Sequence, residues 1–373
     1  MSIRPLAFYL PQFHPIPEND QWWGKGFTEW TNVTKAKPLF KGHWQPRLPA
    51  DLGFYDLRVS EVREAQAMLA KEYGIYGFCY WHYWFAGKRI IERPFMEMVE
   101  SRKPDFPFCI AWANQSWTGT WHGLSQNQTL LEQTYPGEED DRKHFYSLLD
   151  AFSDDRYIEV NDKKLVFIFR PMEIPAPKQF IELWQELAIK EGLKGFHFVG
   201  MHMPFDWQSA EYGYNASIPG FFAQNNYKIN KGNKQNPLFE KLKQGFKQKG
   251  INKEPLIASY EKYVNRYPEL PLNSHQYPWI MTDWDNTPRA GEEGWLFDGS
   301  TPELFGQLCT KAFRATENKN EEEKIVILRS WNEWAEGNYL EPDQKFGTAY
   351  LEQLIKALQT YKQHLTGTSI ITN

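Results

Sequence analysis

The sequence predicts an α/β fold, a single (β/α)8 TIM barrel with long βα loops, over residues 1–373. Three observations lead to this prediction. Strand-like runs alternate with amphipathic stretches along the chain, and a length of 373 residues suits one such barrel. Polar and aromatic side chains also gather just after the strand-like runs, where barrels of this kind carry their functional residues.

Eight short runs have the composition of buried parallel strands. Apolar, β-branched and aromatic residues dominate them, as expected of strands that are covered on both faces. The runs are Pro5–Leu10, Ile75–Trp81, Phe108–Trp112, Leu165–Arg170, Phe196–Met201, Ser217–Phe222, Trp279–Asp283 and Ile325–Ser330.

Amphipathic stretches between these runs predict helices. The clearest are Val59–Tyr73, Asp140–Phe152, Lys178–Glu191, Pro237–Lys247, Pro302–Ala315 and Thr348–His364. The connection after the first strand, from Pro11 to Arg58, is long, and loops of that length inside a compact domain are usually functional. Its indoles fit either a small core of their own or the walls of distant sugar subsites. They are Trp22, Trp23, Trp30 and Trp44.

The composition argues against several classes of protein. A net charge of −5 with both signs interspersed argues against a nucleic-acid surface, and no apolar run approaches the roughly 20 residues of a membrane helix. The three cysteines, Cys79, Cys109 and Cys309, predict neither a disulfide framework nor a zinc site. The sequence shows no signal-peptide pattern before its first strand, so we expect a cytoplasmic protein.

Two glutamates follow the last predicted strand. Ile325–Ser330 is an apolar run, and Glu333 and Glu336 come soon after it. Trp331 and Trp334 flank the first of them. Carboxylates act as general acids and bases, and indole faces stack on sugar rings, so this segment predicts a catalytic pair for sugar chemistry. The alternatives are a solvated acidic loop and, for Glu336 alone, a carboxylate at the start of a helix.

The other strand ends supply candidates for binding a sugar. They are Tyr9, His14, Tyr80, His82, Trp112, Asn114, Trp117, His202, Asp283, Trp284, Asn286, Arg289, Trp331 and Asn332. Aromatic residues make up 16% of the chain, with 16 Trp, which fits an extended carbohydrate cleft better than a core alone. We therefore predict an oligo- or polysaccharide as the partner, and the sequence carries no signal for an oligomeric state.

Some of these candidates have a second interpretation. His14, His82 and His202 fit hydroxyl binding or an orienting role in the core, and their spacing is not that of a metal site. Residues 283–285 read Asp-Trp-Asp, formally the Asp-x-Asp motif that holds a divalent ion and a nucleotide diphosphate in metal-dependent glycosyltransferases. Their position at a strand end favours hydroxyl binding. We expect no metal and no other cofactor.

Six motifs spread over nearly the whole chain are long enough to be specific. They are Phe8-Tyr-Leu-Pro-Gln-Phe-His14, Trp22-Trp-Gly-Lys-Gly-Phe-Thr-Glu-Trp30, Tyr80-Trp-His-Tyr-Trp84, Trp112-Ala-Asn114, Trp284-Asp-Asn-Thr-Pro-Arg289 and Trp331-Asn-Glu-Trp-Ala-Glu-Gly337. Together they resemble the WbsX-type family, which is commonly labelled as glycosyltransferase and found in bacterial polysaccharide loci. That family in turn resembles glycoside hydrolase family 99, the endo-α-mannosidases and mannanases, which are (β/α)8 barrels.

The resemblance implies retaining hydrolysis through a 1,2-anhydro sugar. The segment Asn332–Gly337 is the best match to the hydrolase family's catalytic segment. Glu333 would match the base that deprotonates the sugar 2-hydroxyl, and Glu336 the acid that protonates the leaving oxygen and then activates water. Such a reaction needs a 2-hydroxyl trans to the leaving group, as in α-D-mannosides and α-L-rhamnosides. The loops outside this segment depart from the hydrolase motifs, so mannose itself is not implied.

We therefore expect a retaining glycoside hydrolase that acts on α-linked, manno-configured residues of a bacterial polysaccharide. One alternative is a glycosyltransferase in O-antigen or capsule biosynthesis, which would need a nucleotide sugar and a divalent ion at Asp283 and Asp285. The other is a non-catalytic carbohydrate-binding barrel, and the intact Glu333/Glu336 pair weighs against it.

Overall fold

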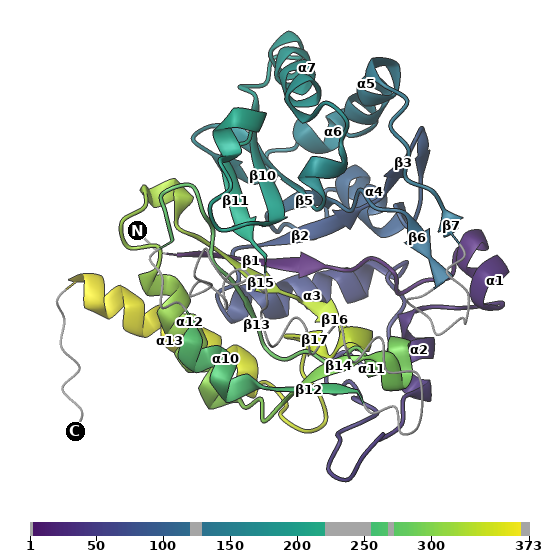
Figure 1. The fold of residues 1–373 in the computed structure, drawn as a ribbon, viewed down its shortest axis with the longest axis vertical. Coiled ribbons are helices and arrows are strands. Elements are labelled where there is room, and N and C mark those ends of the chain that lie inside the picture. Colours follow the sequence, from purple (N-terminus) through teal and green to yellow (C-terminus); the bar gives the residue numbers. More distant parts are fainter. Residues whose placement is uncertain (1–2, 120–128, 221–254, 268–271, 367–373) are drawn as a thin grey trace, which may run out of the picture.

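Eight parallel strands form a nearly closed barrel in the computed structural model, as the sequence predicts (Figure 1). The structure describes residues 3–119, 129–220, 255–267 and 272–366. The barrel strands are β1 (Arg4–Tyr9), β2 (Gly77–His82), β5 (Phe108–Trp112), β9 (Lys163–Ile168), β10 (Phe196–Met203), β11 (Ala216–Pro219), β13 (Trp279–Met281) and β15 (Ile325–Arg329). Around the barrel they follow the order β11-β10-β9-β5-β2-β1-β15-β13.

The two ends of this sheet, β11 and β13, meet at a short seam. Ser217 forms an isolated parallel bridge with Gln276, just before β13. The Ser217 N–H donates to the His275 carbonyl at 2.8 Å, and the Tyr277 N–H donates to the Ser217 carbonyl at 2.9 Å. These bonds bring the sheet nearly to closure and cover the edges that an open sheet would expose.

The register places the C-terminal ends of the strands at one end of the barrel. Leu6 of β1 lies opposite Ile327 of β15 on one side and Gly77 of β2 on the other. The strand arrows of β1 and β2 point to the right in Figure 1, toward α1 (Pro17–Trp23), α2 (Glu29–Lys35) and α11 (Thr287–Ala290). Loops that follow neighbouring strands therefore meet at this end.

Longer helices surround the barrel, and most were predicted. The remaining described helices are α3 (Ser60–Glu72), α4 (Arg93–Ser101), α5 (Glu138–Ser147), α6 (Leu149–Phe152), α7 (Pro177–Lys190), α10 (Tyr260–Arg266), α12 (Pro302–Arg314) and α13 (Ala349–Thr366). Each long helix buries an apolar stripe, as Phe305, Leu308 and Phe313 show on α12. Five predicted helices match α3, α5 with α6, α7, α12 and α13.

The structure differs from the predicted boundaries in a few places. The predicted helix Asp140–Phe152 is divided at Leu148 into α5 and α6. The predicted strand Trp279–Asp283 corresponds to β13, which ends at Met281. The next residue, Thr282, donates its hydroxyl to the Tyr339 carbonyl at 2.9 Å. The predicted helix at 237–247 and the last two residues of the predicted strand at 217–222 lie outside the described residues.

Short elements decorate the barrel ends. The small strands are β3 (Trp84–Phe85), β4 (Lys88–Arg89), β6 (Trp117–Thr118), β7 (Thr129–Leu131), β8 (Glu159–Val160), β12 (Leu256–Ser259), β14 (Trp295–Asp298), β16 (Asn332–Glu333) and β17 (Asn338–Tyr339). Single 3-10 turns lie at Pro171–Glu173, Ser209–Tyr212, Gly291–Glu293, Glu321–Glu323 and Trp334–Glu336. The pair β16 and β17 is antiparallel and directly follows β15.

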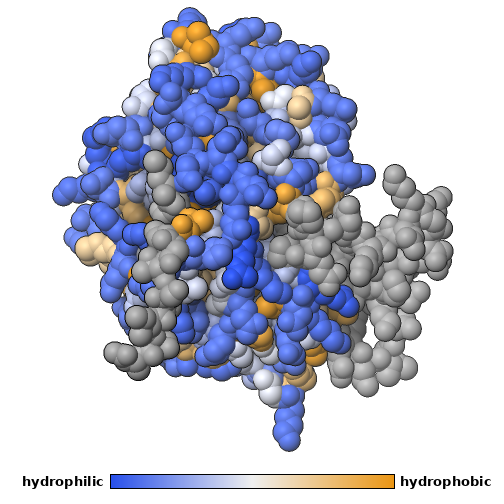
Figure 2. Space-filling view, turned by 90° about the vertical axis from the view of Figure 1, so that its left-hand side faces the viewer, coloured by the Kyte–Doolittle hydropathy of each residue, from blue (hydrophilic) through white to orange (hydrophobic). Residues whose placement is uncertain are grey.

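The face of the molecule seen in Figure 2 is mainly polar among the described residues. Hydrophilic residues cover most of the face in Figure 2, and apolar residues lie there in small separate groups. Within the described ranges, none of the helices combines the length and the apolar composition that crossing a bilayer requires.

Gly77 is a position where the barrel requires the smallest residue. A Cβ at this residue would lie 2.6 Å from the Pro107 carbonyl oxygen and 2.8 Å from Ile158 Cδ1. We expect Gly77→Ala to lower the free energy of unfolding by about 1–3 kcal/mol, because overpacking forces the backbone to shift. Gly220→Ala is the matched control, since its Cβ would make only ordinary contact, 3.4 Å from the His202 oxygen. Denaturant unfolding measures both, and equal losses would contradict the packing argument.

Candidate active site

A pocket lies at the C-terminal end of the barrel and has a cavity volume of about 140 Å³. Its wall combines carboxylates, guanidinium groups, amides and aromatic rings. The lining residues are Leu10, Gln12, Trp23, Glu29, Trp81, Tyr83, Ala113, Gln115, Ser116, Trp117, Thr118, Leu130, Phe169, Arg289, Arg329, Glu333 and Glu336. The pocket is therefore built by segments from both ends of the chain.

A tight turn after β15 places both glutamates on this wall. Glu333 ends β16, and Glu336 ends the 3-10 turn that leads to β17. Gly337 then closes the turn with a φ of +60°, and a Cβ there would lie 2.8 Å from Asp285 Cβ. Glycine fits this backbone because it lacks that atom. Both carboxylates are buried in the protein yet line the pocket.

The guanidinium of Arg289 bridges the two glutamates. Its Nη1 donates to Glu336 Oε1 at 2.7 Å, and its Nη2 donates to Glu333 Oε2 at 3.2 Å. The same Nη2 lies 3.0 Å from Oε2 of a third carboxylate, Glu29. Arg329 adds a longer contact, 3.5 Å from its Nη2 to Glu336 Oε2. Glu336 therefore has two cationic partners and Glu333 one.

Burial favours a proton on Glu333. Together with the charge of Glu336, it raises the pKa of Glu333 to about 8, against the opposing charges of Arg289 and Arg329. Glu336 is the carboxyl that both arginines contact. The two carboxyls thus have different surroundings, and general acid–base chemistry uses such a difference to give an acid and a base separate roles.

Aromatic rings form the other walls. Trp81 lines the pocket and stacks on Phe8, with ring centroids 4.7 Å apart. The edge of Tyr83 faces Trp117 at 5.3 Å, and Trp117 also packs against Trp22 at 5.8 Å. Burial, followed by the charge of Glu333, raises the pKa of Tyr83 far above neutrality, so its hydroxyl stays protonated. These faces suit the apolar side of a sugar ring.

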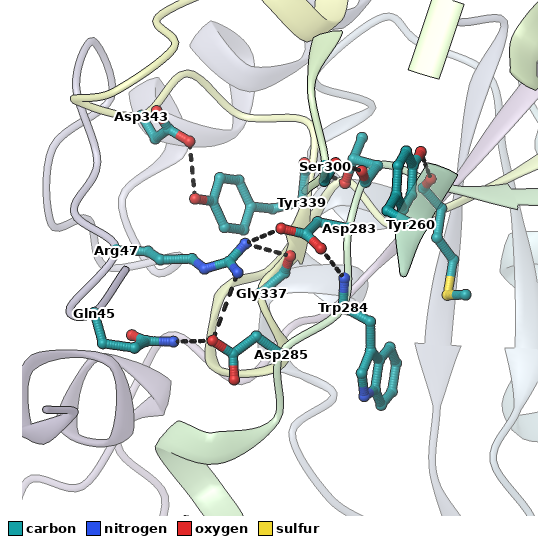
Figure 3. A network of polar contacts seen from close by, with 12 residues as sticks. Gln45, Arg47, Tyr260, Asp283, Trp284, Asp285, Ser300, Gly337, Tyr339 and Asp343 are labelled. Atoms are coloured by element: carbon teal, nitrogen blue, oxygen red, sulfur yellow. Dashed lines mark hydrogen bonds and ion pairs between the residues drawn. The ribbon is translucent and has the colours of Figure 1, made fainter. Parts of the chain in front are cut away.

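A buried ion network contacts the turn that carries Glu333 and Glu336, on the side of Gly337 (Figure 3). Arg47, from the first long loop, donates to Asp283 Oδ2 at 2.8 Å and to the Gly337 carbonyl at 3.1 Å. Its Nη2 also lies 3.5 Å from Asp285 Oδ2. The Asp285 N–H donates to the Glu336 carbonyl at 2.6 Å. The turn is thereby joined to the segment after β13 and to the loop after β1.

The carboxylate oxygens of Asp283 and Asp285 accept hydrogen bonds from other protein groups. His43 Nε2 lies 2.8 Å from Asp285 Oδ2, and Gln45 donates to the same oxygen at 2.7 Å. Thr287 donates its hydroxyl to Asp285 Oδ1 at 2.6 Å. Burial raises the pKa of Asp283 to about 6 even though Arg47 lowers it. Over the described ranges, no cluster of three or more His, Cys, Asp or Glu side chains has an arrangement that could hold a metal ion.

Four of the residues predicted for the site line the pocket. They are Trp117, Arg289, Glu333 and Glu336. Within the part of the chain that the structure describes, the other predicted candidates do not line this pocket. Their side chains lie nearby, within the protein. They are Tyr9, His14, Tyr80, His82, Trp112, Asn114, His202, Asp283, Trp284, Asn286, Trp331 and Asn332.

The asparagine candidates join neighbouring strand ends. Asn332 accepts the Leu10 N–H at 2.7 Å and donates to the Leu10 carbonyl at 3.0 Å. These bonds join the segment after β15 to the end of β1. Asn114 accepts the Arg170 N–H at 2.7 Å and donates to the Arg170 carbonyl at 2.9 Å. These bonds join the ends of β5 and β9. Both asparagines therefore align the loops that carry pocket residues.

The first aromatic and histidine candidates lie in the barrel core. The Tyr9 hydroxyl donates to Gln66 at 2.6 Å, and Trp331 is fully buried. The two Nε2 atoms of His82 and His144 lie 2.8 Å apart. Burial lowers the pKa of both histidines, so one neutral ring donates to the other.

Trp284 supports the pocket from one layer further out. The guanidinium of Arg329 lies 4.7 Å from the ring centroid of Trp284 and 5.3 Å from that of Trp279. His202, with a φ of +58°, packs edge-on against Trp279 at 5.4 Å. These aromatic rings hold Arg329 at the pocket wall through cation–π contacts.

Sequence reasoning missed Glu29 and Arg329 entirely. Each carried a weak signal: Glu29 lies inside the motif Trp22–Trp30, and Arg329 is a charge at the end of a buried strand, where charges are rare. Trp81 and Tyr83 were seen at a predicted strand end but were not chosen as site residues.

The comparison with known sequences decides the family. Residues 5–354 match the family described as Glycosyltransferase WbsX. This protein belongs to that family. It is 34% identical over 358 residues to WxcX, described as uncharacterized, from two strains of Xanthomonas campestris pv. campestris. The alignment covers 95% of this chain and 49% of WxcX, so the chain spans about half the length of these relatives.

Solved structures with a similar fold include glycoside hydrolases. The GH99 endo-α-mannosidase from Bacteroides thetaiotaomicron superposes with a TM-score of 0.58 at 12% identity, over 97% of this chain and 98% of that chain. A structure described as a glycoside hydrolase-like protein gives a TM-score of 0.56 at 14% identity, over 96% and 94% of the two chains. These likenesses confirm the barrel and, at such identities, concern the fold alone.

The raised pKa of Glu333 predicts how stability changes with pH. The folded protein keeps a proton on this carboxyl up to a pH of about 8, whereas the unfolded chain releases it near its ordinary pKa of 4.5. The free energy of unfolding of the wild type should therefore fall, relative to that of Glu333→Gln, as pH rises through this interval. Denaturant unfolding of both proteins at several pH values measures the difference. A difference that stays constant with pH would contradict the buried proton.

Proposed function

We propose that this protein is a retaining glycoside hydrolase that acts on α-linked, manno-configured residues of a bacterial polysaccharide. The observation that carries the proposal is the Glu333/Glu336 pair, which lines a pocket at the C-terminal end of the barrel. Arg289 bridges the two carboxyls, and burial raises the pKa of Glu333 to about 8. Trp81 and Trp117 add aromatic faces for a sugar ring.

The proposed reaction uses the sugar's own 2-hydroxyl as nucleophile. Glu333 takes the proton from the 2-hydroxyl while the sugar's 2-oxygen attacks the anomeric carbon. At the same time Glu336 gives its proton to the departing glycosidic oxygen. The product of this step is a 1,2-anhydro sugar. Glu336 then takes a proton from water, which opens the anhydro ring at the anomeric carbon, and Glu333 returns its proton to the 2-oxygen. Two inversions retain the anomeric configuration.

This mechanism needs one proton on the pair, and its location has to change when the substrate binds. In the substrate-free site the raised pKa of Glu333 favours a proton on that residue, while Glu336 contacts both Arg289 and Arg329. A 2-hydroxyl that donates to Glu333 favours the ionised form of that residue, and a glycosidic oxygen that accepts from Glu336 favours its protonated form. Substrate contacts therefore drive the exchange in the required direction.

The alternative hydrolytic mechanism would use a carboxylate as nucleophile, and Glu29 is the third carboxylate on the pocket wall. Glu29 is 1% exposed and ion-paired with Arg289. Both features favour a supporting role over direct attack. Asp283 and Asp285, the other acidic residues nearby, face Arg47.

Amide variants should separate the two catalytic roles. Glu333→Gln and Glu336→Gln should each lower hydrolysis of an unactivated glycoside by about 10²–10⁴-fold, since neither amide can transfer the proton. With an α-glycosyl fluoride, whose leaving group needs no acid, Glu336→Gln should regain leaving-group release in a single turnover, while Glu333→Gln should not.

Glu292→Gln is the control for these variants, because this glutamate is exposed on the segment that follows Arg289. It should keep wild-type rates. The role assignment would be wrong if the fluoride rescued Glu333→Gln, and the whole site assignment would be wrong if both amide variants kept wild-type activity.

The nucleophile can be tested through the substrate. A 2-deoxy glycoside should be inert and a 2-fluoro glycoside should leave no ester on the protein, because the 2-oxygen forms the new bond. NMR of the first product should show retained configuration. Brisk cleavage of the 2-deoxy compound, or a trapped ester on Glu29, would replace this mechanism with ordinary two-carboxylate hydrolysis.

A glycosyltransferase remains the second candidate, because the family carries that description. We expect thermal unfolding of this protein to be unchanged by nucleoside diphosphates with Mn²⁺, and glycoside hydrolysis to survive EDTA. The contacts of Arg47 with Asp283 and Asp285 support this expectation, since its guanidinium already balances their charge. A manganese-dependent shift would favour the transferase. Glycan binding without any product would instead favour a binding-only barrel.

A further inference from the structure

A third carboxylate, Glu29, is buried directly beside the proposed catalytic pair. It begins α2, and its side chain is almost fully enclosed. Its Oε2 lies 3.0 Å from Arg289 Nη2 and accepts from Arg289 Nε at 3.3 Å. Arg289 is thus shared between Glu29 on one side and the Glu333/Glu336 pair on the other.

The charges of this cluster do not balance when every group is ionised. Glu29, Glu333 and Glu336 are three carboxylates, while Arg289 and Arg329 are two guanidinium groups. One unbalanced negative charge in a buried site is costly, and binding one proton removes it.

The balance counts the groups in ion-pair contact. The charge of Lys35, on the same helix, also acts on Glu29, but among the described residues only the two arginines form ion pairs with these three glutamates. The Tyr83 hydroxyl, which faces Glu333 and Glu336, is neutral because burial raises its pKa. Arg47 lies behind the turn and is engaged with Asp283 and Asp285.

Without Glu29 the same cluster would balance with no proton at all. Two carboxylates would then face two guanidinium groups, and the pair would hold its proton less tightly, although burial and the charge of Glu336 would still raise the pKa of Glu333. A pair that loses its proton at lower pH offers less of the acid that the leaving oxygen requires. Glu29 also contacts two nitrogens of Arg289, which leaves Nη1 for Glu336 and part of Nη2 for Glu333.

We infer that Glu29 is a positioning residue whose negative charge keeps one proton on the Glu333/Glu336 pair and whose ion pair sets Arg289 between them. The catalytic consequence rests on the proposed function. The proton itself does not, because it can be followed in the protein without any substrate.

The experiment is an infrared titration of the substrate-free protein. The carbonyl stretch of the protonated carboxyl is assigned by its change in Glu333→Gln, and its midpoint is then compared between variants. Glu29→Gln should move the midpoint to lower pH by about one unit or more, the size expected for losing a neighbouring like charge. Arg329→Gln should move it to higher pH, because the cluster loses a cation.

The double variant Glu29→Gln/Arg329→Gln is the sharpest arm. It leaves two carboxylates and one guanidinium in the cluster, so one proton is again required and the midpoint should return toward the wild-type value. A purely structural role for Glu29 would not produce opposite shifts that compensate. Glu292→Gln removes an exposed charge nearby and should leave the midpoint unchanged.

Two outcomes would overturn the inference: a Glu29→Gln midpoint equal to that of the wild type, or a double variant that moves further from the wild type. If Glu29→Gln does not fold, Arg329→Gln alone still tests the charge balance, since an unchanged midpoint there contradicts it. Failure to hydrolyse any glycan would sink the proposed function and leave this titration standing. With a substrate in hand, the basic limb of the pH–rate profile should move to lower pH in Glu29→Gln.

Discussion

The active end of this barrel depends on one guanidinium group that three buried carboxylates share. Arg289 contacts Glu29, Glu333 and Glu336. Glu29 comes from the long connection after β1, and the other two come from the turn after β15. Like charges repel strongly in a protein interior, and Arg289 offsets this repulsion because it contacts all three carboxyls. The planar fork of arginine suits this task because its separate N–H groups reach different partners at once. Lysine, as a point charge, could not hold the same arrangement.

A second arginine keeps the turn that carries Glu333 and Glu336 in place without lining the pocket. Arg47 binds the Gly337 carbonyl and the two aspartates at the end of strand seven, and Asp285 holds the Glu336 carbonyl. The turn is short and includes a left-handed glycine, so its backbone has few alternatives once these bonds form. The two arginines therefore divide the work. One fixes the backbone that carries the carboxylates, and the other fixes the charges that the carboxylates present.

The strands, most helices and the carboxylate pair were predictable because their signals are local. A run such as Ile325–Ser330 shows its burial in its own composition, and Glu333 follows it directly. The ion pair between Glu29 and Arg289 joins residues 260 positions apart, and no local pattern indicates which loops meet. Asn332 shows the opposite difficulty. A polar side chain at a strand end looks the same in sequence whether it faces a ligand or, as here, the backbone of the neighbouring strand.

Under the proposed function, the way the pocket is divided between segments indicates which of them would select the substrate. The turn that carries Glu333 and Glu336 is held on two sides by buried ion networks, so it would have little freedom to adapt to different sugars. The remaining wall comes from the first loop, with Trp23, and from the segment after β5, with Gln115 and Trp117. Those side chains are only partly buried, whereas Glu333 and Glu336 on the turn are buried. If the proposed reaction holds, proteins that share the turn and differ in these two segments could apply it to different polysaccharides, because the proposed reaction needs only the 2-hydroxyl and the leaving oxygen to meet the carboxylates.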